Sequence, residues 1–423
     1  MINFRYTSLS ICSLIVYYTS AFAQVQSLSL GESQALAMAN YPMVKERNLI
    51  AQSSAYSIER ANAGYLPQLT INGQATYQSA VTQIPLQLPG MDVPELSKDQ
   101  YKIYGEVNQL MYDGGVTKLQ KEAIDASADI EEQALEVALY QIKERINQLF
   151  FGILLLDAQI AQNGLLKRDV QTGLDKINAA IANGMALKSN GSLLEAELLR
   201  AQQQAIELQA TRSAYLQMLG LFVNRPLGEH TVLETPEAAV SAQEINRPEL
   251  QWYSQQQRGV EIENRLLTAK NLPKLNLFFQ GGAGRPALNM LSNDFEAYYY
   301  TGIRLSFPLT GFYTLKKERA LLHIKTQRIE TKKAAFLFDT SLSLHQQNAE
   351  AIKYQQLLKT DDDIIALRTS VKQAALAQLE NGVINTAEYM REVNAEDTAK
   401  LSKIMHEIQW LAAQYRIKNI SGN

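Results

Sequence analysis

The sequence has almost no cysteine: Cys12 is the only one in 423 residues. It lies in an N-terminal stretch that is expected to be removed, because Arg5 precedes an apolar segment (11–16) and a small-x-small pattern follows at 21–23. The apolar segment is too short for a membrane-spanning first helix. Residues 1–23 are therefore predicted to be a secretory signal, and the exported chain has no thiol for a disulfide, a zinc–cysteine site or a nucleophile.

The sequence also lacks a strong charge of either sign and a long apolar run. Its formal net charge is −3 over 423 residues, so no large electrostatic field points to nucleic acid as a partner. After residue 23 the longest continuous apolar run, 149–156, falls short of the roughly 20 residues that a spanning helix needs. Entry into a membrane would therefore require a β-barrel, since only helices and closed barrels satisfy their backbone hydrogen bonds in lipid.

Signals for catalysis, cofactors and metals are missing as well. The 4 histidines are scattered without a second ligand at i+4, which argues against a zinc site. The acids at 361–363 would splay around a helix and cannot all face one ion. No helix is expected directly after the glycines at 281–284, as a phosphate-binding loop requires. The sequence therefore predicts no enzyme, no cofactor and no metal site.

What the sequence does contain is one order of elements that occurs twice. A helix, two alternating strands around a loop and a long helical hairpin run from about residue 28 to 222, and the same order returns from about 246 to 417. The matching landmarks are Leu66-Pro67 and Leu272-Pro273, Asp113-Gly114-Gly115 and Thr310-Gly311, and Asn183-Gly184 and Asn381-Gly382. Two tandem repeats are predicted, at 24–236 and 237–423.

Four segments show the alternation of apolar and polar residues that is typical of strands with one apolar face, as in Leu69-Thr70-Ile71-Asn72. The predicted strands are 67–78, 101–112, 272–282 and 298–308. Each has about the 9 to 11 residues that cross a bilayer at a tilt. Tyrosines near the strand ends suit an interfacial belt: Tyr77, Tyr101, Tyr298, Tyr299 and Tyr300. A soluble hairpin with one buried face shows the same alternation, so the pattern alone leaves both interpretations open.

The stretches between the paired strands, 79–99 and 285–296, are expected to be external loops. Most of the remaining sequence is helical over unusual lengths. Apolar residues step by four and three through 135–156, and no proline interrupts 115–182 or 313–380. Each of these two stretches can form a helix roughly 100 Å long, at about 1.5 Å per residue. Such helices suit a rod or a wall, with an ordinary helical bundle as the alternative. The predicted helical hairpins are 114–222 and 311–417.

Four strands cannot close a barrel around a lumen, since single-chain barrels begin at about eight strands. An open edge in lipid leaves unpaired backbone groups, at a cost of several kcal/mol each. At least two chains must therefore contribute to a barrel, and a cyclic assembly satisfies every edge by symmetry. The strand count predicts an oligomer without fixing the number of subunits.

These features resemble the TolC family of outer-membrane efflux proteins. The resemblance rests on the export signal, the tandem halves, the Leu-Pro before each first strand, Asp113-Gly114-Gly115, and the Asn-Arg-Pro-Glu-Leu at 246–250. It covers almost the whole mature chain. It implies a mainly α fold with a transmembrane β part: a homotrimer in which four strands per chain form a 12-stranded β-barrel. The antiparallel helical hairpins would form an α-barrel across the periplasm.

The resemblance also implies a function. The chain would be an outer-membrane channel subunit of a tripartite efflux or type I secretion system, and the channel itself would be a passive conduit. A periplasmic adaptor protein would connect it to an inner-membrane transporter that supplies the energy. The main alternative is a periplasmic coiled-coil structural or adaptor protein with a soluble β-domain. No residue pattern names the exported substrate or the class of pump.

In that family the turns of the helical hairpins form the periplasmic tips that meet the adaptor. The resemblance places the tips at Gly184, Met185 and Ala186 and at Gly382, Val383 and Ile384. Glycine suits a tight reversal and small apolar residues suit docking, but any helical hairpin needs such a turn.

Some family members narrow the tunnel near the tip with two aspartates one helical turn apart. The matching positions are Glu388 and Arg391, so one acid remains and a base replaces the other. Glu388 side chains from symmetry-related chains would form one acidic ring that favours cations, or each would pair with Arg391 along its own helix.

Overall fold

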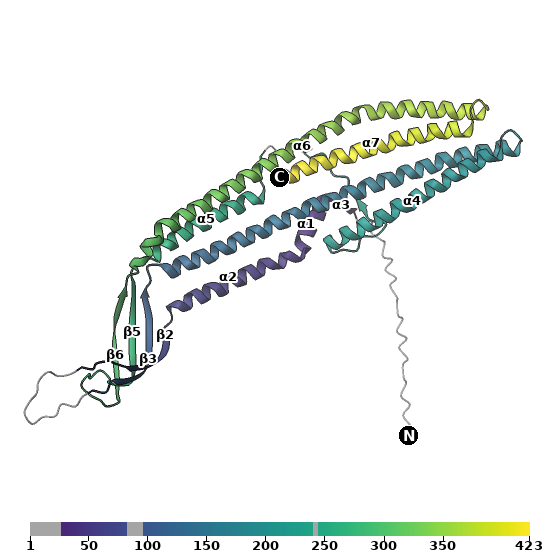
Figure 1. The fold of residues 1–423 in the computed structure, drawn as a ribbon. Helices are drawn as coiled ribbons and strands as arrows, with labels where there is room; N and C mark the ends of the chain where they lie inside the picture. Colours follow the sequence, from purple (N-terminus) through teal and green to yellow (C-terminus); the bar gives the residue numbers. More distant parts are fainter. Residues whose placement is uncertain (1–26, 83–95, 240–243) are drawn as a thin grey trace, which may run out of the picture.

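The computed structural model describes residues 27–82, 96–239 and 244–423. The predicted signal at 1–23 and most of the expected loop at 79–99 lie outside the described residues. The described chain is elongated and mainly helical. A β-sheet lies at one end and the tips of two helical hairpins lie at the other (Figure 1).

On each side of residue 240 the described chain contains a helix, two strands and a long helical hairpin, and the first part has β1, α1 and β4 in addition. The first part contains β1 (Ser27–Leu28), α1 (Leu30–Asn40), α2 (Glu46–Asn62), β2 (Gln68–Tyr77), β3 (Asp99–Tyr112), α3 (Val116–Ala182), α4 (Lys188–Val223) and β4 (Val232–Leu233). The second part contains α5 (Pro248–Ala269), β5 (Lys274–Arg285), β6 (Glu296–Ser306), α6 (Phe312–Glu380) and α7 (Thr386–Ser421). Three short 3-10 helices, Pro42–Lys45, Ala63–Tyr65 and Leu309–Gly311, complete the described elements.

The long helices determine the shape of the molecule. α3 has 67 residues and α6 has 69, and each is followed by a returning helix of 36 residues, α4 or α7. At 1.5 Å per residue α3 and α6 are each about 100 Å long. α7 packs against both α6 and α3, so the two hairpins lie side by side (Figure 1).

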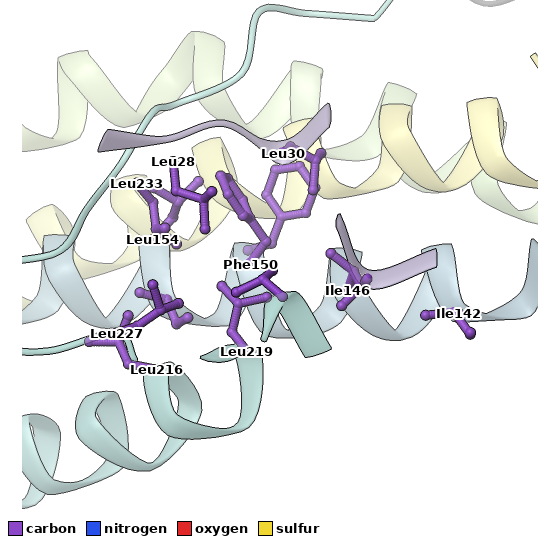
Figure 2. Close-up of a cluster of buried hydrophobic side chains, with 14 of the residues drawn as sticks. Leu28, Leu30, Ile142, Ile146, Phe150, Leu154, Leu216, Leu219, Leu227 and Leu233 are labelled. Atoms are coloured by element: carbon purple, nitrogen blue, oxygen red, sulfur yellow. The ribbon is translucent and has the colours of Figure 1, made fainter. Parts of the chain in front are cut away.

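The largest hydrophobic core lies near the middle of α3. Ile146 and Phe150 of α3 are completely buried and pack with Leu219 of α4 (Figure 2). Leu28 and Leu233 close the core from the side, where β1 and β4 form a short parallel pair. The N-terminal segment and the segment after α4 are thus tied to the middle of the helical part by burial of apolar surface.

Among the described helices, α3 contains one window that is long and apolar enough to cross a membrane by length and composition. The sequence was not expected to contain such a segment after residue 23. The apolar side chains of α3 that form the core, such as Ile146, Phe150 and Ile153, are completely buried inside the molecule. Packing of a core helix therefore accounts for them.

The junction between β3 and α3 is held by Asp113, which is 3% exposed. Its carboxylate accepts hydrogen bonds from the backbone N–H of Gly115 (2.9 Å), the backbone N–H of Thr117 (2.7 Å) and the Thr117 hydroxyl (2.6 Å). The Tyr65 hydroxyl donates a further bond to it at 3.2 Å. The carboxylate therefore caps the first turn of α3 and fixes the angle at which the helix leaves the sheet.

Replacing Asp113 by alanine is expected to destabilise the protein by about 2 kcal/mol, since several donors lose their acceptor. The pKa of Asp113 is lowered overall: burial alone would raise it, but the hydrogen bonds from Thr117, Gly115 and Tyr65 outweigh burial. A folded-state pKa below the unfolded value means that this stabilisation is complete above about pH 3.9 and is lost as the pH falls through the folded-state pKa.

The acid sensitivity can be measured by thermal unfolding of the purified protein between pH 7 and pH 3, followed by circular dichroism. Asp113→Asn keeps the cap oxygen but cannot titrate, so its unfolding temperature is expected to fall less than that of the unsubstituted protein in acid. An equal fall of the unfolding temperature in both proteins would show that protonation of Asp113 does not cause the loss of stability in acid.

Candidate functional site

The four-stranded sheet is antiparallel throughout, in the order β2-β3-β5-β6, with β2 and β6 at its two edges. Directly opposed residues of antiparallel strands project to the same side of a sheet. The register opposes Leu69 to Val107, Val107 to Phe279, and Leu277 to Ile303. One face of the sheet is therefore apolar across all four strands.

Most large apolar side chains on this face are exposed, Ile71 by 77% and Ile303 by 69%. The face contains Leu69, Ile71, Tyr77, Tyr101, Ile103, Val107, Leu275, Leu277, Phe279, Tyr299, Ile303 and Leu305. In a soluble hairpin such a face is buried against the rest of the molecule. Here it is left uncovered by the described part of the chain, which is the state expected of a surface that meets lipid.

The opposite face is mainly polar. It contains Gln68, Thr70, Asn72, Gln74, Thr76, Lys102, Glu106, Asn108, Lys274, Asn276, Gln280 and Arg304. Arg304 of β6 forms an ion pair with Glu106 of β3 at 3.3 Å. The sheet thus separates one apolar from one polar environment.

The register departs from simple alternation at one position of β3. Between Leu110 and Tyr112 the pairing with β5 shifts, and Tyr112 stands opposite Leu275. Simple alternation from Val107 would place Met111 on the apolar face, but Met111 is the extra residue of a β-bulge.

The expected belt of tyrosines is divided between the two faces. Tyr77, Tyr101 and Tyr299 lie on the apolar face, whereas Tyr298 and Tyr300 project from the polar face. The belt prediction is wrong for these last two, because neighbouring residues of a strand point to opposite sides.

At the other end of the molecule the two hairpin tips have the same backbone geometry. Gly184 and Gly382 are left-handed, with φ of 71° and 67°. The N–H of Met185 donates to the carbonyl of Ala180 and that of Val383 donates to the carbonyl of Gln378, each at 2.8 Å. This is the Schellman ending of a helix, in which glycine adopts a conformation that a side chain disfavours.

The tip residues differ in exposure. Met185 is 75% exposed and Val383 is 70% exposed, whereas Ala186 and Ile384 are half-buried. Ile384 packs against a cluster behind the tips, so it contributes to the joint between the hairpins. Leu187, which the sequence did not single out, is 71% exposed beside Met185. Its position directly after the turn was the feature of the sequence that could have identified it as a tip residue.

A hydrophobic cluster behind the tips joins the two hairpins. It consists of Val170, Leu174 and Ile177 of α3, Leu194 of α4, Ala375 of α6, and Tyr389, Met390 and Val393 of α7. Because all four long helices contribute, the tips are held in a fixed relation to each other.

Glu388 and Arg391 do not pair with each other in the way the sequence allowed. The Asn385 side chain accepts the N–H of Glu388 at 2.9 Å, and the Glu388 carboxylate accepts the N–H of Asn385 at 3.0 Å. This is a capping box at the start of α7. Arg391 instead pairs with Glu392 at 3.1 Å. Both Glu388 and Arg391 are exposed near the tip.

Farther from the tip, Lys372 of α6 connects three helices. Its Nζ lies 2.9 Å from Asp169 of α3 and 2.6 Å from Glu396 of α7. Glu396 is 2% exposed and also accepts from Lys400 (3.0 Å) and Thr369 (2.6 Å). Burial alone would raise the pKa of Glu396, but the hydrogen bonds from Lys372, Thr369 and Lys400 outweigh it and lower the pKa overall.

Two of the three consecutive acids of α6 pair with α7. Asp361 lies 2.8 Å from Nδ1 of His406, and Asp362 lies 2.6 Å from Nζ of Lys403. The described residues contain no group of three or more histidine, cysteine, aspartate or glutamate side chains that is placed to hold a metal ion.

Comparisons with known proteins find no match by sequence but find several similar folds. No protein-family model and no curated protein matches the sequence. Among solved structures, the chain is similar to the outer membrane protein VceC of Vibrio cholerae, with 12% identity, a TM-score of 0.66, and coverage of 93% of this chain and 96% of VceC.

Two further channels show the same similarity. The CmeC outer membrane channel of Campylobacter jejuni has 12% identity and a TM-score of 0.64, over 93% of this chain and 85% of CmeC. CusC, whose structures describe transmembrane channel formation, has 11% identity and a TM-score of 0.69, over 100% of this chain and 99% of CusC. The resemblance to the TolC family is thus confirmed at the level of the fold, and the chain has the architecture of outer-membrane efflux channels.

Proposed function

We propose that this chain is one subunit of an outer-membrane channel, a passive conduit for export in a tripartite efflux or type I secretion system. The observation that carries the proposal is the sheet: four strands with two open edges and one exposed apolar face. Open edges and an apolar face are tolerated in lipid only when the sheet closes into a barrel. Three copies give 12 strands, as the resemblance to the TolC family implies.

Exposed apolar residues on the flanks of the helical part support the same assembly. On α6 they are Leu321, Ile324, Phe338, Leu342, Ile352 and Leu367, and on α2 and α4 they are Leu49, Tyr56, Leu199 and Ile206. Each of the pairs on α2 and α4 is seven residues apart, and on α6 Leu321 and Ile324 are three apart and Phe338 and Leu342 are four apart, which is the spacing of residues on one face of a helix. One flank of each subunit would meet the opposite flank of the next.

The helical part would then form a tunnel wall in the periplasm. The two hairpins have closely similar lengths and the same tip geometry, which supports an origin as a tandem repeat divided near residue 237. The exposed tip residues, chiefly Met185 and Val383, form small apolar surfaces that suit docking of a periplasmic adaptor protein. The adaptor would connect the channel to an inner-membrane transporter.

The first test is the protein mass of material extracted from outer membranes in detergent, measured by light scattering with the micelle subtracted. Three chains per particle are expected. A monomer that stays soluble without detergent would contradict the channel and would leave the periplasmic rod with a soluble β-domain in its place.

Glu388→Gln is expected to lower the preference of the reconstituted channel for cations, because it removes one carboxylate per subunit near the tip. The glutamine oxygen still accepts the N–H of Asn385, so the capping box is kept. Glu388→Ala should change the selectivity equally and also destabilise the start of α7 by about 1 kcal/mol. The measurement is the reversal potential across planar bilayers in a salt gradient. An unchanged reversal potential in Glu388→Gln would remove this residue from the gate.

A further inference from the structure

We propose that the polar face of the sheet binds planar aromatic anions during their passage. This inference rests on the proposed function, because the barrel would turn this face toward the lumen. The aromatic rings on the apolar face, such as Phe279 and Tyr299, would meet lipid instead. The rings on the polar face are Tyr104, Phe278, Tyr298 and Tyr300, and they lie among charged and amide side chains.

Three of these rings form a continuous row along β5 and β6. Tyr298 and Tyr300 are stacked with their planes at 19°, and their centroids are 6.4 Å apart, close to the spacing of alternate residues on a strand. Phe278 meets Tyr300 edge to face at 5.7 Å. The guanidinium group of Arg304 lies 4.6 Å from the centre of the Phe278 ring. The row therefore begins at an aromatic pair and ends at a cation.

Gly302 makes this row possible. It lies between Tyr300 and Arg304 on the polar face and opposite Phe278. A Cβ at this position would come within 3.1 Å of the Phe278 ring. The absence of a side chain on Gly302 leaves room for the Phe278 ring of β5 over this position of β6, a known arrangement of aromatic residues and glycine on neighbouring strands. The rings thus form a surface with exposed edges and faces, and Tyr300 is 41% exposed.

The charges on this face favour an anion. The strands place Lys102, Lys274 and Arg304 on it against Glu106 and Glu296, so bases outnumber acids by one in each chain. The contact of Arg304 with Glu106 uses only Nη1. Among the described residues the other N–H groups of the guanidinium are thus left for a ligand, and arginine binds sulfonate, carboxylate and phosphate oxygens well. An aromatic body against Tyr300 and Phe278 with its anionic group at Arg304 contacts both the rings and the cation.

The test is the block of single-channel current in planar bilayers by naphthalene-2-sulfonate. Cyclohexanesulfonate, which has the charge but no aromatic ring, and 1-methylquinolinium, which has the rings but the opposite charge, are the comparison probes. Naphthalene-2-sulfonate is expected to block for longer than either. Tyr300→Leu is expected to shorten its residence time about tenfold, the effect of losing one stacking surface. Arg304→Gln should shorten it similarly.

The matched control is Tyr299→Leu, which removes the neighbouring ring from the other face and should leave the residence time unchanged. Unaltered open-channel conductance in the variants shows that they fold and assemble. If the channel conducts but naphthalene-2-sulfonate and cyclohexanesulfonate block it for equal times, the aromatic site is overturned and the channel is not. The same holds if Tyr300→Leu and Tyr299→Leu change the residence time equally. Absence of any conductance in the unsubstituted protein would overturn the channel itself and the site with it.

Discussion

Replacing Ile71 by lysine is expected to prevent assembly in the outer membrane while leaving the fold of the single chain nearly unchanged. Ile71 lies near the middle of β2 on the apolar face and is 77% exposed, so the substitution breaks few contacts within the chain. A lysine facing lipid near the bilayer midplane costs roughly 2 to 4 kcal/mol. In a trimer the cost applies to each of the three subunits.

Thr70→Lys is the matched control, since Thr70 is the neighbouring residue of the same strand and projects from the polar face. Its lysine would lie in the water-filled lumen, and a normal yield of trimer is expected. The yield is measured by light scattering of the detergent extract at equal expression. Loss of trimer in Thr70→Lys with a normal yield in Ile71→Lys would show that the polar face meets lipid and the apolar face does not.

The faces of the sheet follow from the sequence because the alternation of side chains needs no knowledge of which strands pair. The same periodicity from Ile303 places Tyr299 on the apolar face and Tyr298 and Tyr300 on the other. The expectation of a single tyrosine belt overlooked this. The bulge at Met111 is different, since it arises from the pairing of β3 with β5 and leaves no mark in the sequence of β3 alone.

The lengths of α3 and α6 follow from uninterrupted apolar spacing and the lack of proline, and the turns between helices follow from Asn-Gly pairs. The role of Glu388 was also readable, because Asn385 three residues earlier gives the spacing of a capping box. Comparison with the aspartates of the TolC family directed attention to a gate instead.

Contacts between distant parts of the chain were beyond prediction. Arg247, part of the Asn-Arg-Pro-Glu-Leu motif, lies 4.7 Å from the ring centre of Tyr140 and 5.8 Å from that of Phe336. It also donates to the carbonyl of Asn419 at 3.4 Å. Four segments meet at this side chain, and no local pattern specifies such a meeting. The motif therefore marks a structural joint at the start of α5.

Lys372→Met is expected to destabilise the helical part by about 3 to 5 kcal/mol, the usual cost of removing one partner from a buried ion pair. The substitution leaves Glu396, which is 2% exposed, with only Lys400 and Thr369 as partners, and it separates Asp169 of α3 from α6. Because a hydrogen bond from Lys372 helps to hold the pKa of Glu396 below its usual value, that pKa should rise in the variant.

Lys176→Met provides the comparison, because Lys176 also joins α3 to α6, through Glu380, but with side chains that are 40% and 47% exposed. Solvent screens such a pair, and its loss should cost less than about 1 kcal/mol. Thermal unfolding followed by circular dichroism distinguishes the two variants. Since stabilisation by Glu396 is lost as the pH falls through its folded-state pKa, Lys372→Met should also begin to lose stability at a higher pH than the unsubstituted protein. Equal unfolding temperatures for the two variants would mean that the buried ion pair of Lys372 stabilises the packing of the two hairpins no more than the exposed pair of Lys176 does.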